Sequence, residues 1–170
     1  PPQAFKGRPL LDWRQVRELH AAGIEFGSHT VNHPALYGLD WPEIESEIRD
    51  SKSAIEQRLG TSVPAFAYPF AFPQSDRAYA VRLQDLLRSA GYRSCVTTAV
   101  GRARPDGNVF ELPRLPVNSG DDAALFCGKL AGHYDWLALP QVLVKTVKQA
   151  IRPGRRHLMA PQPAPTVLDQ

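Results

Sequence analysis

Helical segments and short apolar runs alternate along this chain, and the alternation constrains its fold more than any other feature. Helices are predicted over five segments, residues 12–22, 40–60, 75–90, 121–130 and 139–151. Between them lie four apolar runs that predict strands, residues 24–26, 65–68, 92–98 and 109–117. Strands that alternate with helices pair in parallel through helical crossovers. The sequence therefore predicts an α/β fold.

Capping residues support the boundaries of these helices. Asp12 is predicted to cap the first helix, and Asp40 begins a capping-box pattern at the start of the second. Ser75 is predicted to cap the third helix, and either Asp121 or Asp122 the fourth. Each of these side chains can accept a hydrogen bond from a backbone N–H that the first helical turn leaves without a partner.

The number of strands limits the architecture. Four strands are fewer than the roughly eight of a closed barrel, and no predicted strand precedes the first helix. We therefore expect part of a distorted (β/α) barrel whose N-terminal strands are missing. Residues 1–152 are interpreted as this partial domain, and the Pro-rich residues 153–170 as a disordered tail. Residues 1–8 have neither a starting Met nor an apolar signal core, which is typical of the interior of a longer chain.

Composition argues against several classes of function. No apolar run approaches the roughly 20 residues of a transmembrane helix, and two cysteines without CxxC spacing suggest no thiolate metal site. The net charge is +3, and the basic stretch 145–156 carries no interleaved aromatic residues, which disfavours nucleic-acid binding. The chain fits a soluble protein of the cytoplasm or the cell envelope, and composition decides neither the compartment nor the oligomeric state.

Two histidines four residues apart follow the first apolar run. His29 and His33 come after the Gly27-Ser28 turn, which would place them at the rim of the sheet, where sites in α/β folds usually lie. A single helical turn that ends before Pro34 is expected to bring both imidazoles to one side. There they could chelate one divalent ion. The alternative is a pair of capping or hydrogen-bonding histidines at a strand end, and the spacing alone favours that alternative.

Several strings of residues together resemble one known family. Residues 11–19 and 22–34, which include the two histidines, are similar to the second motif of the polysaccharide deacetylases. This family is the NodB-homology group, also called carbohydrate esterase family four. The string Phe66-Ala67-Tyr68-Pro69-Phe70 resembles its third motif, and residues 91–93 and 112–117 resemble further strings. The resemblance extends from residue 10 to residue 136.

The resemblance implies a metal-dependent hydrolysis. His29 and His33 would hold a divalent metal, with zinc as the expected ion, together with an Asp, and a preceding Asp would act as general base. The substrate would be an N-acetylated polysaccharide or oligosaccharide that loses acetate. The resemblance assigns the oxyanion contact to the backbone N–H of Phe70. Arg114 would orient a catalytic carboxylate, or alternatively form a surface ion pair.

The chain also departs from the family. The Asp-Asp motif would lie before Pro1, and no Asp within residues 1–28 replaces it, because Asp12 is better used as a helix cap. Ala71 stands where the family has Gly, and Ala67 where many members have Arg. We therefore expect the C-terminal portion of a longer deacetylase, which would not catalyse the reaction by itself. The alternatives are a catalytically inactive, glycan-binding remnant of the same fold and a truncated chain that does not fold stably.

Three more side chains are candidates for substrate contact. Tyr68 and Pro69 lie in the third motif, and Trp41 could offer the face of its ring to a sugar. Each has a structural alternative. Tyr68 and Pro69 could form a rigid strand exit packed by aromatic rings, and Trp41 could be a hydrophobic staple at the start of a helix.

Overall fold

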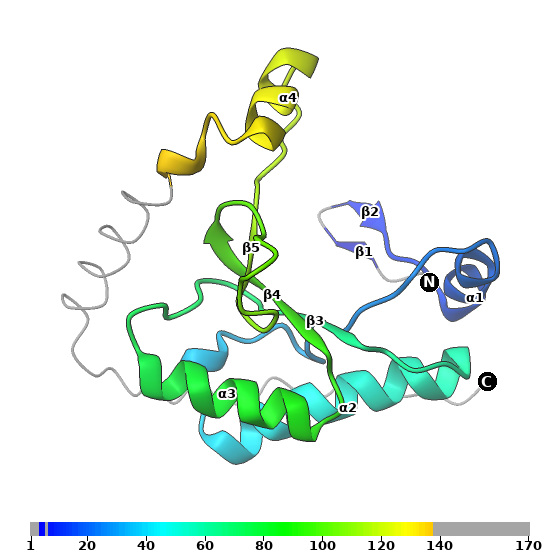
Figure 1. Ribbon diagram of the computed structural model, residues 1–170. Coiled ribbons are helices and arrows are strands. Elements are labelled where there is room, and N and C mark those ends of the chain that lie inside the picture. The colour runs from blue at the N-terminus through cyan, green and yellow to red at the C-terminus, as the bar shows by residue number, and fades with distance from the viewer. Residues whose placement is uncertain (1–3, 6, 138–170) are drawn as a thin grey trace.

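The computed structural model describes residues 4–5 and 7–137 of the chain. The order of its elements, drawn in Figure 1, is β1 (Ala4–Phe5), β2 (Arg8–Pro9), α1 (Trp13–Ala21), η1 (Leu36–Gly38), α2 (Trp41–Leu59), β3 (Ala65–Ala67), α3 (Arg77–Ser89), β4 (Ser94–Val100), β5 (Leu112–Arg114), α4 (Ala123–Ala131) and η2 (Asp135–Leu137). The predicted helix over 139–151 and the predicted tail over 153–170 lie outside the described residues. Within the described ranges, no helix has the length and apolar character needed to cross a membrane.

Three parallel strands form the central sheet, in the order β3-β4-β5. Phe66 of β3 pairs with Cys95 of β4, and Val96 of β4 pairs with Leu112 of β5. Helix α3 connects β3 to β4 and supplies the crossover that parallel pairing requires. The predicted α/β class is thereby confirmed. The described residues contribute these three parallel strands, and the distorted barrel remains a prediction.

The core lies between this sheet and the helices α2 and α3, which Figure 1 shows on the same side of the sheet. Buried and half-buried residues alternate along β4, with Cys95, Thr97 and Ala99 in the buried positions. Burial raises the pKa of the Cys95 thiol to about 12, so this cysteine behaves as a small core residue. From the two helices, the core takes Ile44, Ile48, Leu83 and Leu87.

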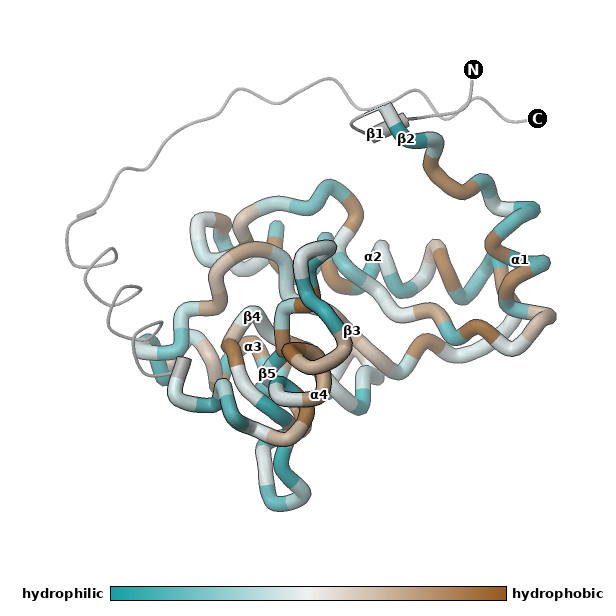
Figure 2. The backbone as a smooth tube through the Cα atoms, turned by 90° about the horizontal axis from the view of Figure 1, so that it is seen from above, coloured by the Kyte–Doolittle hydropathy of each residue, from teal (hydrophilic) through white to brown (hydrophobic). Residues whose placement is uncertain are grey.

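Helix α1 and the β1–β2 hairpin stand outside that core. Figure 2 shows both of them at one end of the molecule, beyond the end of α2 and away from the sheet. None of the residues of α1 is fully buried, and its Trp13 ring faces the Arg58 guanidinium of α2 at 5.4 Å. The fold is therefore held by the sheet with α2 and α3, and α1 packs against the C-terminal end of α2.

Asp12 and Asp40 cap the first two long helices as predicted, and both helices begin with a capping box, which was predicted for the second alone. The Asp12 carboxylate accepts a hydrogen bond from the N–H of Gln15 at 2.7 Å, and the Gln15 side chain accepts one from the N–H of Asp12 at 2.9 Å. Asp40 and Glu43 make the same exchange at α2. Gly60 ends α2 with a φ of 68°, a left-handed conformation that glycine adopts without strain.

Replacing Asp40 with alanine is expected to lower the free energy of unfolding by about 1 kcal/mol. The change removes the acceptor of the Glu43 N–H and opens the capping box at the start of the helix that carries much of the core. Urea titration followed by circular dichroism measures the effect. Asp50→Ala, in the exposed middle of the same helix, is the matched control and should change the free energy by less than about 0.5 kcal/mol. Equal losses in the two variants would contradict the role of the cap.

The predicted strand over residues 24–26 is not formed, and a single bridge takes its place. Ser28 pairs in parallel with Phe66, and the N–H of Ser28 donates to the carbonyl of Ala65 at 2.9 Å. Gly27 permits this approach, because a Cβ at that position would lie 3.2 Å from the same carbonyl oxygen. An apolar run becomes a strand only where a neighbouring strand pairs with it, and pairing with β3 reaches only Ser28.

Other predicted boundaries shift by a few residues. The cap of α3 is Asp76, whose carboxylate accepts from the N–H of Tyr79 at 3.0 Å, and not Ser75. Asp122 is the cap of α4. The strand predicted over 109–117 shortens to β5, because residues 108–111 form a turn in which the N–H of Glu111 donates to the Asn108 carbonyl at 2.9 Å, and Pro116 supplies no N–H to a ladder. The β1–β2 hairpin before α1 was not predicted.

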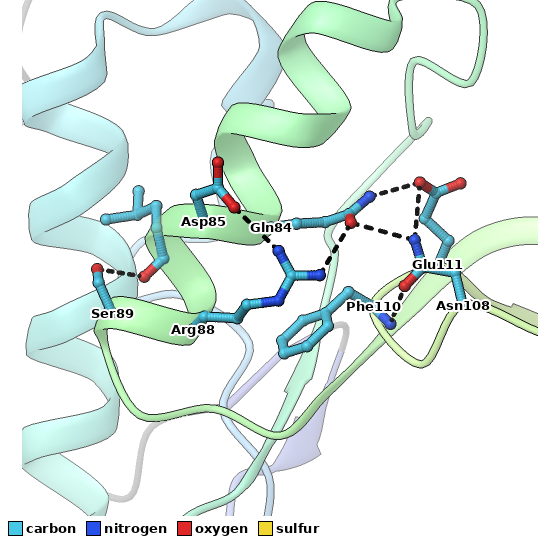
Figure 3. A network of polar contacts seen from close by, with 8 residues as sticks. Gln84, Asp85, Arg88, Ser89, Asn108, Phe110 and Glu111 are labelled. Atoms are coloured by element: carbon cyan, nitrogen blue, oxygen red, sulfur yellow. Dashed lines mark hydrogen bonds and ion pairs between the residues drawn. The ribbon is translucent and has the colours of Figure 1, made fainter.

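A polar network ties the segment before β5 to α3, as Figure 3 shows. The side-chain amide of Gln84 donates to the Glu111 carboxylate at 2.5 Å, and the side-chain amide of Asn108 donates to the side-chain oxygen Oε1 of Gln84 at 3.1 Å. The Arg88 guanidinium lies over the Phe110 ring, 4.7 Å from its centroid. These contacts fix the loop that leads into β5 against the helix layer.

Candidate metal centre

Ser28 anchors the segment that carries the two histidines. The N–H of Ala67 donates to the Ser28 carbonyl at 2.8 Å, which completes the bridge to β3. The Ser28 and Ser51 hydroxyls lie 2.6 Å apart in the interior, so the same residue is also joined to α2. The chain that follows Ser28 leaves the sheet after this parallel bridge, beside the carboxyl end of β3, where sites in α/β folds usually lie. The backbone at Ser28 is therefore fixed, and this fixes the position from which the His29 side chain extends.

A backbone carbonyl orients the His29 ring. Its Nδ1 lies 2.6 Å from the carbonyl oxygen of Ala67. A carbonyl only accepts hydrogen bonds, so Nδ1 is the donor, and in the neutral ring Nε2 presents a lone pair. Histidines that bind metals in proteins commonly donate their second N–H to a carbonyl or carboxylate in this way.

The structure brings the two predicted histidines together. The ring centroids of His29 and His33 are 4.7 Å apart, with an angle of 76° between the ring planes. Phe70 lies on the loop after β3, and the centroid of its ring is 4.6 Å from that of His33. Both histidines are exposed, so a ligand can reach them from solvent.

The predicted helical turn between the histidines is wrong. Thr30 and His33 have φ values of 69° and 53°, in the left-handed region, and the N–H of His33 donates to Oγ1 of Thr30 at 3.1 Å. Each non-glycine residue in this region costs about 1–3 kcal/mol, most of all a β-branched one such as Thr30, and the surrounding structure must outweigh that cost. The histidines meet through a strained loop and not through a helix.

Glu47 of α2 contacts this loop and was not among the predicted site residues. Its carboxylate accepts hydrogen bonds from Val31 and Asn32, which lie between the two histidines. Glu47 is half-buried and lies three residues after the buried Ile44, at the border of the buried face of α2. A carboxylate at that position was the signal that could have identified it.

The third-motif residues divide between the core and the surface. The Tyr68 side chain is 1% exposed, and its hydroxyl lies 3.2 Å from that of Tyr79. Burial is the main reason that the pKa of Tyr68 is raised well above its ordinary value. Pro69 is also buried, whereas Phe70 is 55% exposed with a φ of 55°. The Tyr68 and Pro69 side chains thus pack as a rigid strand exit, and the Phe70 side chain lies at the surface beside His33.

Trp41 and Arg114 are used in packing and strand positioning. The Trp41 ring lies 5.2 Å from that of Tyr79, with the Arg82 guanidinium 4.2 Å from its centroid. Trp41 lines an open groove between α2 and α3. Neither His29 nor His33 lines this groove. Arg114 donates from Nε to the Thr97 carbonyl at 2.6 Å and from Nη2 to the Tyr68 carbonyl at 3.4 Å. Of the acidic side chains that the structure describes, none forms an ion pair with Arg114.

The donor set fits a divalent ion in part. Two adjacent imidazoles, one with its Nε2 lone pair fixed, are nitrogen ligands of the kind that zinc takes. Over residues 4–5 and 7–137, no group of three or more His, Cys, Asp or Glu side chains is placed to hold a metal. Asp12 caps α1, as predicted, and does not supply the missing carboxylate.

Comparisons with known proteins agree on one family. The family model for polysaccharide deacetylase matches residues 5–95. YxkH of Bacillus subtilis (strain 168), which carries the name of a polysaccharide deacetylase, is 29% identical over 116 residues. That match covers 68% of this chain and 39% of YxkH, so the chain spans well under half of this relative's length.

Solved structures of deacetylases share the fold. The Streptococcus pyogenes deacetylase PplD in complex with acetate aligns with a TM-score of 0.61 at 24% identity, over 73% of this chain and 52% of PplD. A polysaccharide deacetylase from Bacillus cereus aligns with a TM-score of 0.59 at 22% identity, over 74% of this chain and 38% of the other. At these identities the likeness concerns the fold.

Proposed function

The chain belongs to the polysaccharide deacetylase family, and from this membership we propose that it contributes to the hydrolysis of N-acetyl groups on a polysaccharide or oligosaccharide. The observation that carries the proposal is the pair of adjacent imidazoles, His29 and His33, within the matched segment. The carbonyl of Ala67 holds the His29 ring with Nε2 as the free nitrogen, which is the orientation that metal ligation needs.

We further propose that His29 and His33 bind a divalent ion, with zinc as the expected metal. A zinc ion held there would supply Lewis acidity, which polarises an amide carbonyl and lowers the pKa of water so that hydroxide is available near neutral pH. The backbone N–H of Phe70 is proposed as a hydrogen-bond donor to the developing oxyanion, because Phe70 lies beside His33. Arg114 donates to the carbonyls of Tyr68 and Thr97 and so joins the start of this loop, just after β3, to β4.

In this proposal, the general base and a third metal ligand are carboxylates other than those that the structure describes near the histidines. No His, Cys, Asp or Glu side chain that the structure describes joins the two histidines in a group of three. We propose that this chain acts as part of a longer deacetylase, whose Asp pair supplies both functions.

Acetate release by the native polypeptide tests the proposed function. The native protein is expected to release acetate from an N-acetylglucosamine oligomer. This release should stop when a chelator is added and resume when zinc is added back. The variant His29→Ala/His33→Ala is expected to release acetate only at the rate of the uncatalysed control, because both nitrogen ligands are gone. Acetate release by this variant at the wild-type rate would contradict the proposal.

A catalytically inactive glycan-binding remnant is the alternative function. The exposed Phe70 ring favours it, since an aromatic face can stack on a sugar. The packing of Tyr68 and Trp41 weakens it, because the Tyr68 side chain is buried and the Arg82 guanidinium lies against the Trp41 ring. Retention of the oligomer in chelator without acetate release would favour this alternative.

A further inference from the structure

One carboxylate from helix α2 holds the loop between the two histidines. Oε2 of Glu47 accepts hydrogen bonds from the N–H of Val31 at 2.7 Å and from the N–H of Asn32 at 3.0 Å. Oε1 of the same carboxylate accepts from the side-chain amide of Asn32 at 2.6 Å. Both carboxylate oxygens therefore accept hydrogen bonds from the loop. Glu47 affects the histidines by holding the backbone between them.

The loop requires an external restraint of this kind. Thr30 and His33 occupy the left-handed region on either side of the two N–H groups that Glu47 binds. Within the loop, one hydrogen bond from the His33 N–H to Oγ1 of Thr30 opposes relaxation. A conformation that sterics disfavour persists only where surrounding contacts fix it. Hydrogen bonds to a charged acceptor are among the stronger contacts available for this purpose.

Glu47 is itself on a rigid support. Helix α2 begins at the capping box of Asp40 and Glu43, and Ile44 and Ile48 bury its inner face in the core. Ile44 lies three residues before Glu47 and so neighbours it on the surface of the helix. The carboxylate thus transmits the fixed position of α2 to residues 31 and 32.

We propose that Glu47 is a positioning residue of the two-histidine site, which holds residues 30–33 in the conformation that places the His33 ring beside His29. The inference rests on the proposed function for the identity of the bound ion. The positioning itself concerns only this chain and is present without metal. Removing the acceptors of Glu47 should therefore separate the two rings and weaken the binding of an ion that needs both.

Three variants of the full chain separate positioning from general stability. Glu47→Met removes both acceptors and keeps a similar length and helix propensity. Glu47→Gln keeps a carbonyl oxygen for the two N–H groups, and its amide can pair with Asn32 if the Asn32 amide turns over. Glu45→Met is the matched control, because Glu45 lies on the same helix and its charge partner is Arg49 of that helix.

Two measurements decide the inference. The first is the nuclear Overhauser effect between the ring protons of His29 and His33 in the metal-free protein. We expect it in the wild type, in Glu47→Gln and in Glu45→Met, and we expect it to be absent in Glu47→Met. The second is zinc affinity by calorimetry, which Glu47→Met should weaken about 10–100-fold, the range for groups that orient metal ligands. Glu47→Gln should stay within about threefold of the wild type, because its acceptor remains.

Several outcomes would overturn the inference. An unchanged Overhauser effect and unchanged zinc affinity in Glu47→Met would do so, as would equal losses in Glu47→Met and Glu45→Met. If no variant binds zinc, the proposed metal function fails, and the Overhauser effect still decides the role of Glu47. If Glu47→Met does not fold, Asn32→Asp replaces it, since a second carboxylate opposite Glu47 should open the loop without altering α2. Retention of the ring contact in Asn32→Asp would then overturn the inference.

Discussion

Replacing both His29 and His33 with alanine is expected to abolish zinc binding by this chain. The two imidazoles are the nitrogen donors of the candidate centre, with ring centroids 4.7 Å apart. The wild-type chain should bind zinc with micromolar or weaker affinity, because the described residues supply two ligands and no third one joins them. Loss of both leaves nothing at the end of the Ser28 bridge that can hold the ion.

A matched histidine variant keeps this test specific. His20 lies on α1, with Nδ1 3.3 Å from the Ile24 carbonyl oxygen and Nε2 3.3 Å from the Thr61 hydroxyl. His20→Ala removes one imidazole from the chain without touching the loop, and it should bind zinc as the wild type does. Isothermal titration calorimetry on the three proteins measures the affinities, with circular dichroism to verify the fold. Equal heats for the wild type and the double variant would mean that the histidines do not bind the metal.

Capping signals in the sequence predicted the starts of two helices correctly. Asp12 and Asp40 cap their helices as predicted, because a capping box needs only residues three positions apart. The prediction of a strand at residues 24–26 was wrong because a strand, unlike a cap, depends on residues distant in the sequence. Whether such a run becomes a strand depends on a partner, and the partner that Ser28 finds, Phe66, lies far along the chain.

The site was predicted in part, and by a wrong local conformation. The spacing of His29 and His33 predicted that a helical turn brings them together. In the structure, a loop with residues in the left-handed region does so. What orients them is remote in sequence: the Ala67 carbonyl holds His29, and Glu47 holds the loop. Hydrogen-bond partners separated by 15 or more positions leave no periodic trace in a single sequence, so this support was visible only in the fold.

Replacing Phe66 with alanine is expected to lower the free energy of unfolding by about 3–5 kcal/mol. Phe66 is 1% exposed at the centre of β3, pairs with Cys95 of β4, and packs its ring 5.4 Å from that of Tyr92. Truncation leaves a cavity between the sheet and the helices, and the loss of dispersion contacts adds to the loss of apolar burial. Urea titration followed by fluorescence measures it, provided that the slope of the transition stays constant.

Val81→Ala, on the exposed side of α3, is the control for this loss. Val81 is 44% exposed, and its truncation should change stability by less than about 0.5 kcal/mol. Because Phe66 lies in the strand that bridges to Ser28, Phe66→Ala should also weaken zinc binding at urea concentrations where Val81→Ala remains folded and binds normally. Equal destabilisation by the two variants would contradict a core centred on β3. Unaltered zinc affinity in unfolded Phe66→Ala would show that the histidines need no fold to bind the ion, and the role assigned to Ser28 and Ala67 in placing them would then be lost.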